Sequence, residues 1–509
     1  MDKKILLFFI LIAAVSAYLL SLASPEIFPF TPDSVYYLES ARNIKTGNGY
    51  CYTTANIEPF DKDILQSMYQ WPPGYSILIA GLSLLGINEP AAALLIPSIA
   101  FLLLPLAFFI LFRFITDKMK SFWIAVIIPF SMPCFILALM VMSDMLFLLI
   151  VLVSFIILFK AIKENSPFWS FAAGVFSGLA LVTRNAGYAL FISVILSLIL
   201  SSIYKLLSTK NSLKIASGYT AGFIATYAPL LFHNIAMFGL TQPFSVPASK
   251  SSFAKNTLVY AKAFNLTVLG NENYLIIFCV ISSIILTLVA IHTLKDKTLI
   301  KLKDCSPKKL IYIICLISYA LFGSLLIIAA LTKYQLGEPA YARYTLQYSW
   351  IYIFFFSIAT LFLIKKISRR YHINPLYPIG GLIIIYLFLQ LTATINIITE
   401  HKQESAEIKY LNLDAAVSII NNLPKDTYII SNNSALLRSL TDKKIRSLEK
   451  IHITNLIKVF PKTRNIAIVL IKKRGVFYDK KTGLPPLPEG SKYLMANGKI
   501  VIIFRRSTL

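Results

Sequence analysis

A segment near the N-terminus combines an acid, tyrosines and a base at spacings that could support catalysis. It reads Thr31-Pro32-Asp33-Ser34-Val35-Tyr36-Tyr37-Leu38-Glu39-Ser40-Ala41-Arg42. Pro32 lacks a backbone N–H and suits the first turn of a helix, so Asp33 falls near the positive end of the helix dipole. A carboxylate placed there could act in acid–base chemistry. The alternative interpretation is that Asp33 only stabilises a helix lying on the membrane.

A second candidate segment is Trp71-Pro72-Pro73-Gly74-Tyr75, which begins a short apolar stretch. Trp71 and Tyr75 could form a stacking surface for a sugar ring. They could equally be ordinary aromatic anchors at the membrane interface.

Three ionisable residues stand at the ends of apolar segments, where a charge is costly and therefore suggests a function. They are Asp144 in Ser143-Asp144-Met145-Leu146, Arg184 in Thr183-Arg184-Asn185, and Arg343 in Tyr341-Ala342-Arg343-Tyr344. All three are predicted at the same outer membrane level as Asp33. Arginine suits bidentate binding of phosphate, so one reading is a pocket at the membrane boundary. The other is snorkelling with mutual pairing of Asp144 and Arg184.

The composition indicates which elements must position these residues. The chain has 509 residues, of which 57% are apolar and 14% charged, and the mean hydropathy is +0.69. A soluble protein is nearer a quarter charged, so a polytopic α-helical membrane protein is predicted. About 11 transmembrane helices are expected at 5–23, 90–112, 121–141, 143–160, 167–183, 186–204, 215–237, 273–293, 310–331, 346–364 and 376–398. The stretch 75–87 is too short to span and is predicted to be an interfacial helix in the first outer loop.

The basic residues predict the orientation of these spans. With the N-terminus cytoplasmic, 20 of the 49 Lys and Arg residues fall in inner connections and 9 in outer ones before residue 400. This excess agrees with the positive-inside rule. An odd number of spans then places residues 400–509, which hold the other 20, outside the cell (inner or plasma) membrane. The net charge of +25 is thus assigned to topology and lipid contact, and no nucleic acid partner is expected.

Two domains are predicted from this organisation. Residues 1–399 form a transmembrane catalytic domain, in which 24–73 is the first outer loop. Residues 400–509 form a small extracytoplasmic α/β domain, with a helix near 404–422, strands at 427–431, 466–472 and 498–505, and short helices near 434–440 and 453–459. The five Cys and five His are scattered, so neither a disulfide framework nor a zinc site is expected. No cofactor is certain, and a divalent metal remains open.

Taken in order, these motifs resemble the GT-C glycosyltransferases. The resemblance rests on the acid after the first span, Pro-Pro-Gly-Tyr, Ser-Asp, Thr-Arg-x-x-Gly and Arg-Tyr, together with Leu423-Pro424-Lys425-Asp426-Thr427 in the last domain. Within this family, the motifs more specifically resemble the bacterial branch related to protein O-mannosyltransferases, the lipid A aminoarabinose transferase and the envelope galacturonosyl and glucosyl transferases. Two places depart from the family pattern. Gln70-Trp71 stands where relatives often have a charged residue or His, and Thr345-Leu346-Gln347 where they often have prolines.

The resemblance implies a polyprenyl-phosphate sugar donor and an envelope acceptor, which could be a glycolipid, a glycan or a protein. It implies a catalytic Asp33 acting as general base, with Asp144 as a supporting acid and Arg343 and Arg184 on the donor phosphate. The remaining candidates, expected to bind substrate, are Tyr37, Arg42, Trp71, Tyr75 and Tyr344. A single displacement at the outer face would invert the anomeric carbon.

Two other functions remain open from the sequence. A transporter or flippase of lipid-linked glycans would need charges at mid-membrane and usually repeated halves. A polymerase or ligase of lipid-linked glycans would place its chemistry in a large late outer loop. The charged residues of this chain lie at one boundary and begin directly after the first span, which favours the transferase.

Overall fold

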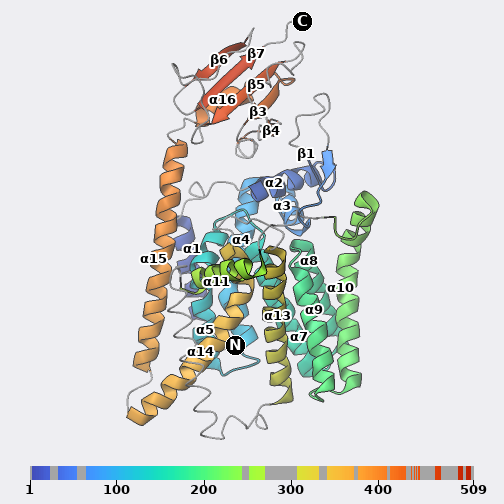
Figure 1. The fold of residues 1–509 in the computed structure, drawn as a ribbon, viewed down its shortest axis with the longest axis vertical. Helices are drawn as coiled ribbons and strands as arrows, with labels where there is room; N and C mark the ends of the chain where they lie inside the picture. The colour runs from blue at the N-terminus through green and yellow to red at the C-terminus, as the bar shows by residue number, and fades with distance from the viewer. Residues whose placement is uncertain are drawn as a thin grey trace. The chain divides into compact units, whose positions relative to one another are not determined.

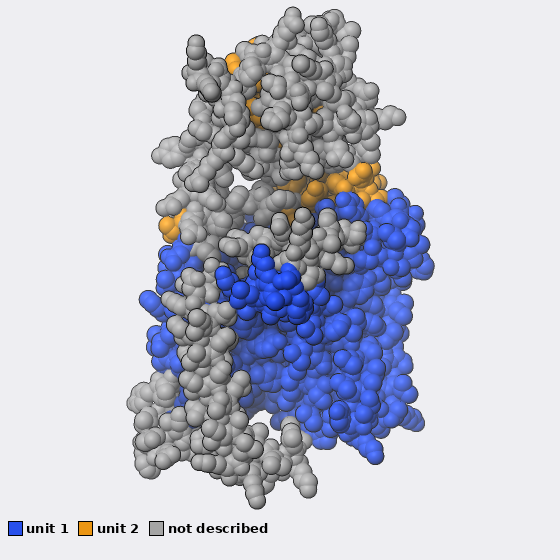
Figure 2. Space-filling model, viewed as in Figure 1, with its two compact units in different colours: residues 1–24, 69–75, 94–397 blue, residues 25–68, 76–93, 398–509 orange. Residues whose placement is uncertain are grey.

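The computed structural model describes residues 3–22, 32–53, 65–243, 252–269, 306–331, 341–371, 376–409, 413–431, 437, 441, 443, 445–447, 465–471, 491–496 and 500–505. The chain forms two compact units (Figure 2). The first comprises residues 1–24, 69–75 and 94–397, and the second residues 25–68, 76–93 and 398–509.

The first unit is built of apolar helices, several of which run side by side (Figure 1). In chain order they are α1 (Lys3–Leu22), α4 (Glu89–Phe112), α5 (Lys118–Ile127), the 3-10 turn η2 (Ile128–Phe130), α6 (Met132–Ala138), α7 (Asp144–Glu164), α8 (Pro167–Thr183), α9 (Gly187–Ile203), α10 (Thr209–Phe238), α11 (Phe253–Leu269), α13 (Pro307–Leu331), α14 (Tyr341–Tyr371) and α15 (Leu376–Lys409). Residues 89–93 of α4 and 398–409 of α15 belong to the second unit.

Six helices of the described part of the chain are long and apolar enough to cross a membrane: α1, α4, α7, α10, α13 and α14. Each coincides with a predicted span, and the chain is an integral membrane protein. Helices α8 and α9 have 17 residues each and are shorter than a full span. The predicted span 273–293 lies outside the described residues.

The predicted span 121–141 is not one helix. The chain bends by 60° between Lys118–Phe130 and Met132–Ala138. Pro129 and Pro133 lie at the first turns of the 3-10 segment and of α6, where each removes a backbone donor and favours a new helix start. Gln390 of α15 stabilises the break, because its Oε1 accepts the Met132 N–H at 2.7 Å and its Nε2 donates to the Val268 carbonyl at 2.8 Å.

Helices α8 and α10 pack closely against each other through glycines. Gly174 and Gly178 on α8 lie against residues 219–226 of α10, and Gly218 and Gly222 on α10 lie against residues 167–175 of α8. A Cβ at Gly174 would overlap the Tyr219 carbonyl, and one at Gly222 would overlap the Phe171 carbonyl. Both pairs have the Gly-x-x-x-Gly spacing by which membrane helices bring their backbones together.

The second unit begins with α2 (Pro32–Lys45), the hairpin strands β1 (Cys51–Thr53) and β2 (Leu65–Ser67), and α3 (Gly74–Leu84), whose first two residues belong to the first unit. Strands β1 and β2 pair antiparallel, with Cys51 opposite Ser67 and Thr53 opposite Leu65. The helix predicted at 75–87 is therefore present as α3.

The C-terminal part of the second unit contains a five-stranded sheet in the order β4-β3-β5-β7-β6. Its elements are α16 (Leu413–Asn421), β3 (Tyr428–Ser431), β4 (Ile445–Ser447), β5 (Ile466–Ile471), β6 (Ser491–Ala496) and β7 (Ile500–Arg505). Strand β3 is parallel to β4 and β5, and β7 is antiparallel to β5 and β6.

Alternate residues of the central strands face two separate apolar clusters, as the period of two requires. Ile429, Val469 and Ile502 pack with Ala416 and Ile420 of α16. Ile430, Ile468 and Ile503 form the cluster on the opposite face. The three predicted strands are present, whereas β4 and β6 were not predicted. The helix predicted over 404–422 is divided into the end of α15 and α16, and the short helices near 434–440 and 453–459 fall almost wholly outside the described residues.

Candidate active site

Asp144 is the first residue of α7 and is buried, with 1% of its side chain exposed. The chain reaches it through the non-helical segment that follows α6, so the carboxylate lies in the first turn of the helix. The dipole of α7 favours its negative charge there. Neither carboxylate oxygen has a hydrogen-bond partner of good geometry among the described residues, so its contacts are ionic.

Arg184 ends α8 in an extended conformation and brings its guanidinium to Asp144. Its N–H bonds the Ala180 carbonyl, and its own carbonyl accepts the N–H of Gly187, which begins α9. The Arg184 Nη1 lies 2.5 Å from Asp144 Oδ2, and 9% of the Arg184 side chain is exposed. Helices α7 and α8 are antiparallel, so the start of α7 lies beside the end of α8. This arrangement brings Asp144 and Arg184 together as the predicted ion pair.

Arg343 completes the cluster from the first turn of α14. Its Nε lies 3.9 Å from Asp144 Oδ1, and 11% of its side chain is exposed. Its Nη1 lies 3.9 Å from the sulfur of Met142. The ring of Tyr344 is 5.0 Å from the Arg343 guanidinium carbon and 5.8 Å from that of Arg184, within the range of cation–π attraction.

The charge of this cluster indicates what it can bind. One carboxylate contacts two guanidinium groups, so Asp144, Arg184 and Arg343 together carry a net positive charge. Arginine presents a planar fork of donors that matches carboxylate and phosphate oxygens. A buried arrangement of this kind can bind an anion, with Asp144 holding both arginines in place.

The Pro-Pro-Gly-Tyr segment packs directly beside Arg184. A Cβ added at Gly74 would lie 2.8 Å from the Val182 carbonyl and 3.1 Å from Thr183 Oγ1. Tyr75 is fully buried, and Trp71 is half-buried. Only glycine permits this approach, which places the segment of Trp71 and Tyr75 against the last turn of α8, in the same unit as the charged cluster.

The predicted acidic helix belongs to the second unit. Helix α2 begins at Pro32, with Asp33 half-buried in its first turn, as the sequence predicts. Tyr37 and Ala41 are 2% and 0% exposed and form the buried face, where the Tyr37 carbonyl accepts a hydrogen bond from Ser76 Oγ at 3.1 Å. The participation of Asp33, Tyr37 and Arg42 in the same site as Asp144 stays a prediction.

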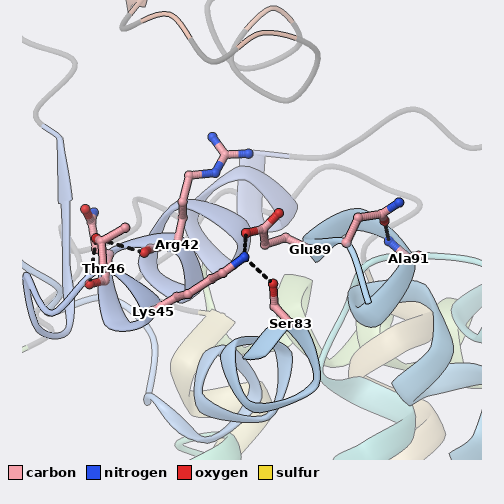
Figure 3. Close-up of polar contacts among 8 residues, drawn as sticks. Arg42, Lys45, Thr46, Ser83, Glu89 and Ala91 are labelled. Carbon is pink, nitrogen blue, oxygen red and sulfur yellow. Dashed lines mark hydrogen bonds and ion pairs between the residues drawn. The ribbon is translucent and has the colours of Figure 1, made fainter. Parts of the chain in front are cut away.

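Lys45, the last residue of α2, forms polar contacts with α3 and with the first residue of α4 (Figure 3). Its Nζ donates to Ser83 Oγ of α3 at 2.9 Å and contacts Glu89 Oε1 of α4 at 3.0 Å. Figure 3 shows the Arg42 guanidinium on the same side of α2 as the Glu89 carboxylate. Arg42 is half-buried, which leaves part of it accessible for the predicted substrate contact.

A metal site is not indicated within the described ranges, where no group of three or more His, Cys, Asp or Glu side chains lies together. One buried polar residue near the cluster was not predicted as a site residue. Gln347 is 1% exposed and lies one turn along α14 from Arg343. An amide side chain within a predicted membrane span is a signal that could have identified it.

Known proteins resemble this chain in structure but not in sequence. No family model and no curated protein matches it. The crystal structure of ArnT from Cupriavidus metallidurans in the apo state superposes with a TM-score of 0.61 at 12% identity, covering 98% of this chain and 97% of that one. The same protein bound to undecaprenyl phosphate gives 0.59 at 11% identity, with 98% of each chain covered. ArnT, the lipid A aminoarabinose transferase, is a member of the GT-C superfamily, so the likeness establishes the fold.

Proposed function

We propose that this chain, which has the GT-C fold, transfers a sugar from a polyprenyl-phosphate donor to an envelope acceptor at the outer face of the membrane. The observation that carries the proposal is the buried, net positive cluster of Asp144, Arg184 and Arg343 at the ends of apolar helices. A phosphate attached to a lipid tail brings both an anion and an apolar chain, which such a place can accommodate. The ArnT structure with bound undecaprenyl phosphate supports this choice of ligand.

In this proposal Arg343 and Arg184 bind the donor phosphate, and Asp144 orients the two guanidinium groups. The acceptor hydroxyl attacks the anomeric carbon and forms the new C–O bond, while the bond from that carbon to the phosphate oxygen breaks. The electron pair leaves with the polyprenyl phosphate, and the arginines stabilise its charge. The acceptor proton goes to Asp33 as general base, and the single displacement inverts the anomeric carbon.

The proposal is tested first by binding. The probes are undecaprenyl phosphate and its uncharged alcohol, and the proteins are the full-length wild type and Arg343→Met in detergent. We expect the phosphate to bind the wild type at least tenfold more tightly than the alcohol, with this preference reduced in Arg343→Met. A wild-type protein that does not distinguish the two lipids would refute a lipid-phosphate site.

The transfer reaction is tested in cells. Deletion of the protein should remove one sugar from an envelope glycan or glycolipid, as seen by mass analysis. Wild type and Asp117→Asn, a surface change, should restore it, and Asp33→Asn at equal abundance should not. Restoration by Asp33→Asn would exclude Asp33 as the general base. Movement of a lipid-linked glycan across reconstituted vesicles without sugar transfer would favour a flippase.

A further inference from the structure

Gln347 is a buried amide whose polar atoms have no hydrogen-bond partner in the part of the chain that the structure describes. Its side chain is 1% exposed, and neither Oε1 nor Nε2 has a hydrogen-bond partner among the described residues. Burial of an unsatisfied amide is costly, and native proteins seldom accept it without a water or a ligand. The backbone around it is fixed, since the Trp350 indole N–H donates to the Gln347 carbonyl at 2.9 Å.

A second buried glutamine shows what a purely structural amide looks like in this fold. Gln390 of α15 is also 1% exposed, but its Oε1 and Nε2 are both bonded to backbone groups, those of Met132 and Val268. The unsatisfied state of Gln347 is therefore not a general property of buried amides in this protein.

Gln347 lies at the boundary between the charged cluster and an aromatic core. Arg343 is four residues before it, so the two side chains share one face of α14. One to two turns further along the helix, Trp350 and Phe354 pack on Phe108 and Phe112, and the rings of Phe112 and Phe354 stack at 4.1 Å. A lipid-linked sugar phosphate carries a sugar on one side of its phosphate and an apolar chain on the other. If the phosphate contacts Arg343, one of these two groups would lie near Gln347.

We propose that Gln347 binds hydroxyl groups of the sugar carried on the lipid phosphate, an inference that rests on the proposed function. An amide presents one acceptor oxygen and two N–H donors, and a hydroxyl both donates and accepts. An ionised phosphate offers only acceptors, so it could satisfy Nε2 but not Oε1. The two ligand groups are thus assigned to different side chains, with the phosphate on Arg343 and Arg184 and the sugar hydroxyls on Gln347.

The test compares Gln347→Met, which removes the amide at similar volume, with the wild type and with Gln390→Met. The probes are undecaprenyl phosphate and the same lipid carrying glucose, galactose, mannose or N-acetylglucosamine. Dissociation constants are measured for the full-length protein in detergent, together with the thermal midpoint of the unliganded protein. The sugar contribution is the ratio of the constants with and without the sugar.

We expect at least one sugar to strengthen binding to the wild type, and Gln347→Met to reduce that gain about 10- to 100-fold while its constant for undecaprenyl phosphate stays within twofold. Its unliganded midpoint should not fall, because an unsatisfied group has been removed. Gln390→Met should lower the thermal midpoint, and the folded fraction of that variant should show the same sugar gain as the wild type.

Three results would overturn the inference. They are an unchanged sugar gain in Gln347→Met, an equal loss for all lipids accompanied by a lower midpoint, or no sugar gain in the wild type. All three results are compatible with a wild-type protein that binds undecaprenyl phosphate, so the proposed function would survive them. Failure of the wild type to bind undecaprenyl phosphate would instead remove the proposed function itself.

Discussion

Asp144→Asn should destabilise the unliganded protein strongly, because it removes the carboxylate that two buried guanidinium groups contact. Asp144 is 1% exposed and Arg184 9%, with 2.5 Å between Oδ2 and Nη1. Two unit charges about 4 Å apart interact by about 4 kcal/mol at an effective dielectric constant of about 20. Measured losses on breaking buried ion pairs are about 3–5 kcal/mol, and we expect the same range here.

The matched control is Asp117→Asn, which changes an acid of the same type at the surface. Asp117 contacts Lys120 at 2.7 Å, but the two side chains are 53% and 45% exposed. Exposed pairs contribute about 0–1 kcal/mol, and asparagine retains the N-cap bond that Asp117 Oδ1 accepts from the Lys120 N–H. Unfolding in detergent with increasing denaturant, followed by circular dichroism, measures both variants.

The double variant Asp144→Leu with Arg184→Leu separates a structural pair from a binding site. Apolar residues in place of a buried ion pair are often neutral or stabilising, so the double variant should regain the part of the lost stability that comes from Arg184, whereas the buried Arg343 guanidinium still loses its contact with Asp144. It should not regain binding of undecaprenyl phosphate or sugar transfer. The burial argument fails if Asp144→Asn costs no more than Asp117→Asn. Recovery of transfer by the double variant would mean that the pair only holds the helices together.

Two further predictions concern other parts of the molecule. Gly222→Ala on α10 should cost about 1–3 kcal/mol of stability through overpacking, because its Cβ would meet the Phe171 carbonyl. The control, Gly381→Ala on α15, has nothing within 4 Å of the added Cβ and should be neutral or slightly stabilising. Equal effects of the two variants on unfolding in detergent would contradict the close α8–α10 contact. Burial raises the pKa of the Cys51 thiol, and the Glu39 carboxylate raises it further. Less thiolate than usual therefore forms near pH 8. The rate of Cys51 alkylation, followed by mass spectrometry, should be low and should rise about tenfold per pH unit below the pKa. The rate should be higher in Glu39→Gln, and an unchanged rate in that variant would exclude the influence of Glu39.

Much of the helical framework was predictable because it is a local property. A run of about 20 apolar residues must become a helix in lipid, where no water satisfies the backbone. The six helices that are long and apolar enough to span, the start of α2 at Pro32 and the short helix α3 follow from such local signals. The bend at Phe130–Met132 was missed because apolar composition alone does not register where prolines divide a span. The three-residue strand β4 and the edge strand β6 carry weak periodicity.

The sequence by itself determined that Asp144, Arg184 and Arg343 stand at helix ends, because charges interrupt or end apolar runs. Only the tertiary structure decided that the three meet, since their contact depends on how α7, α8 and α14 pack. The same holds for Gln347, which in the sequence was only a departure from a family pattern. Whether a buried amide is satisfied depends on atoms from other helices, and no local pattern encodes them.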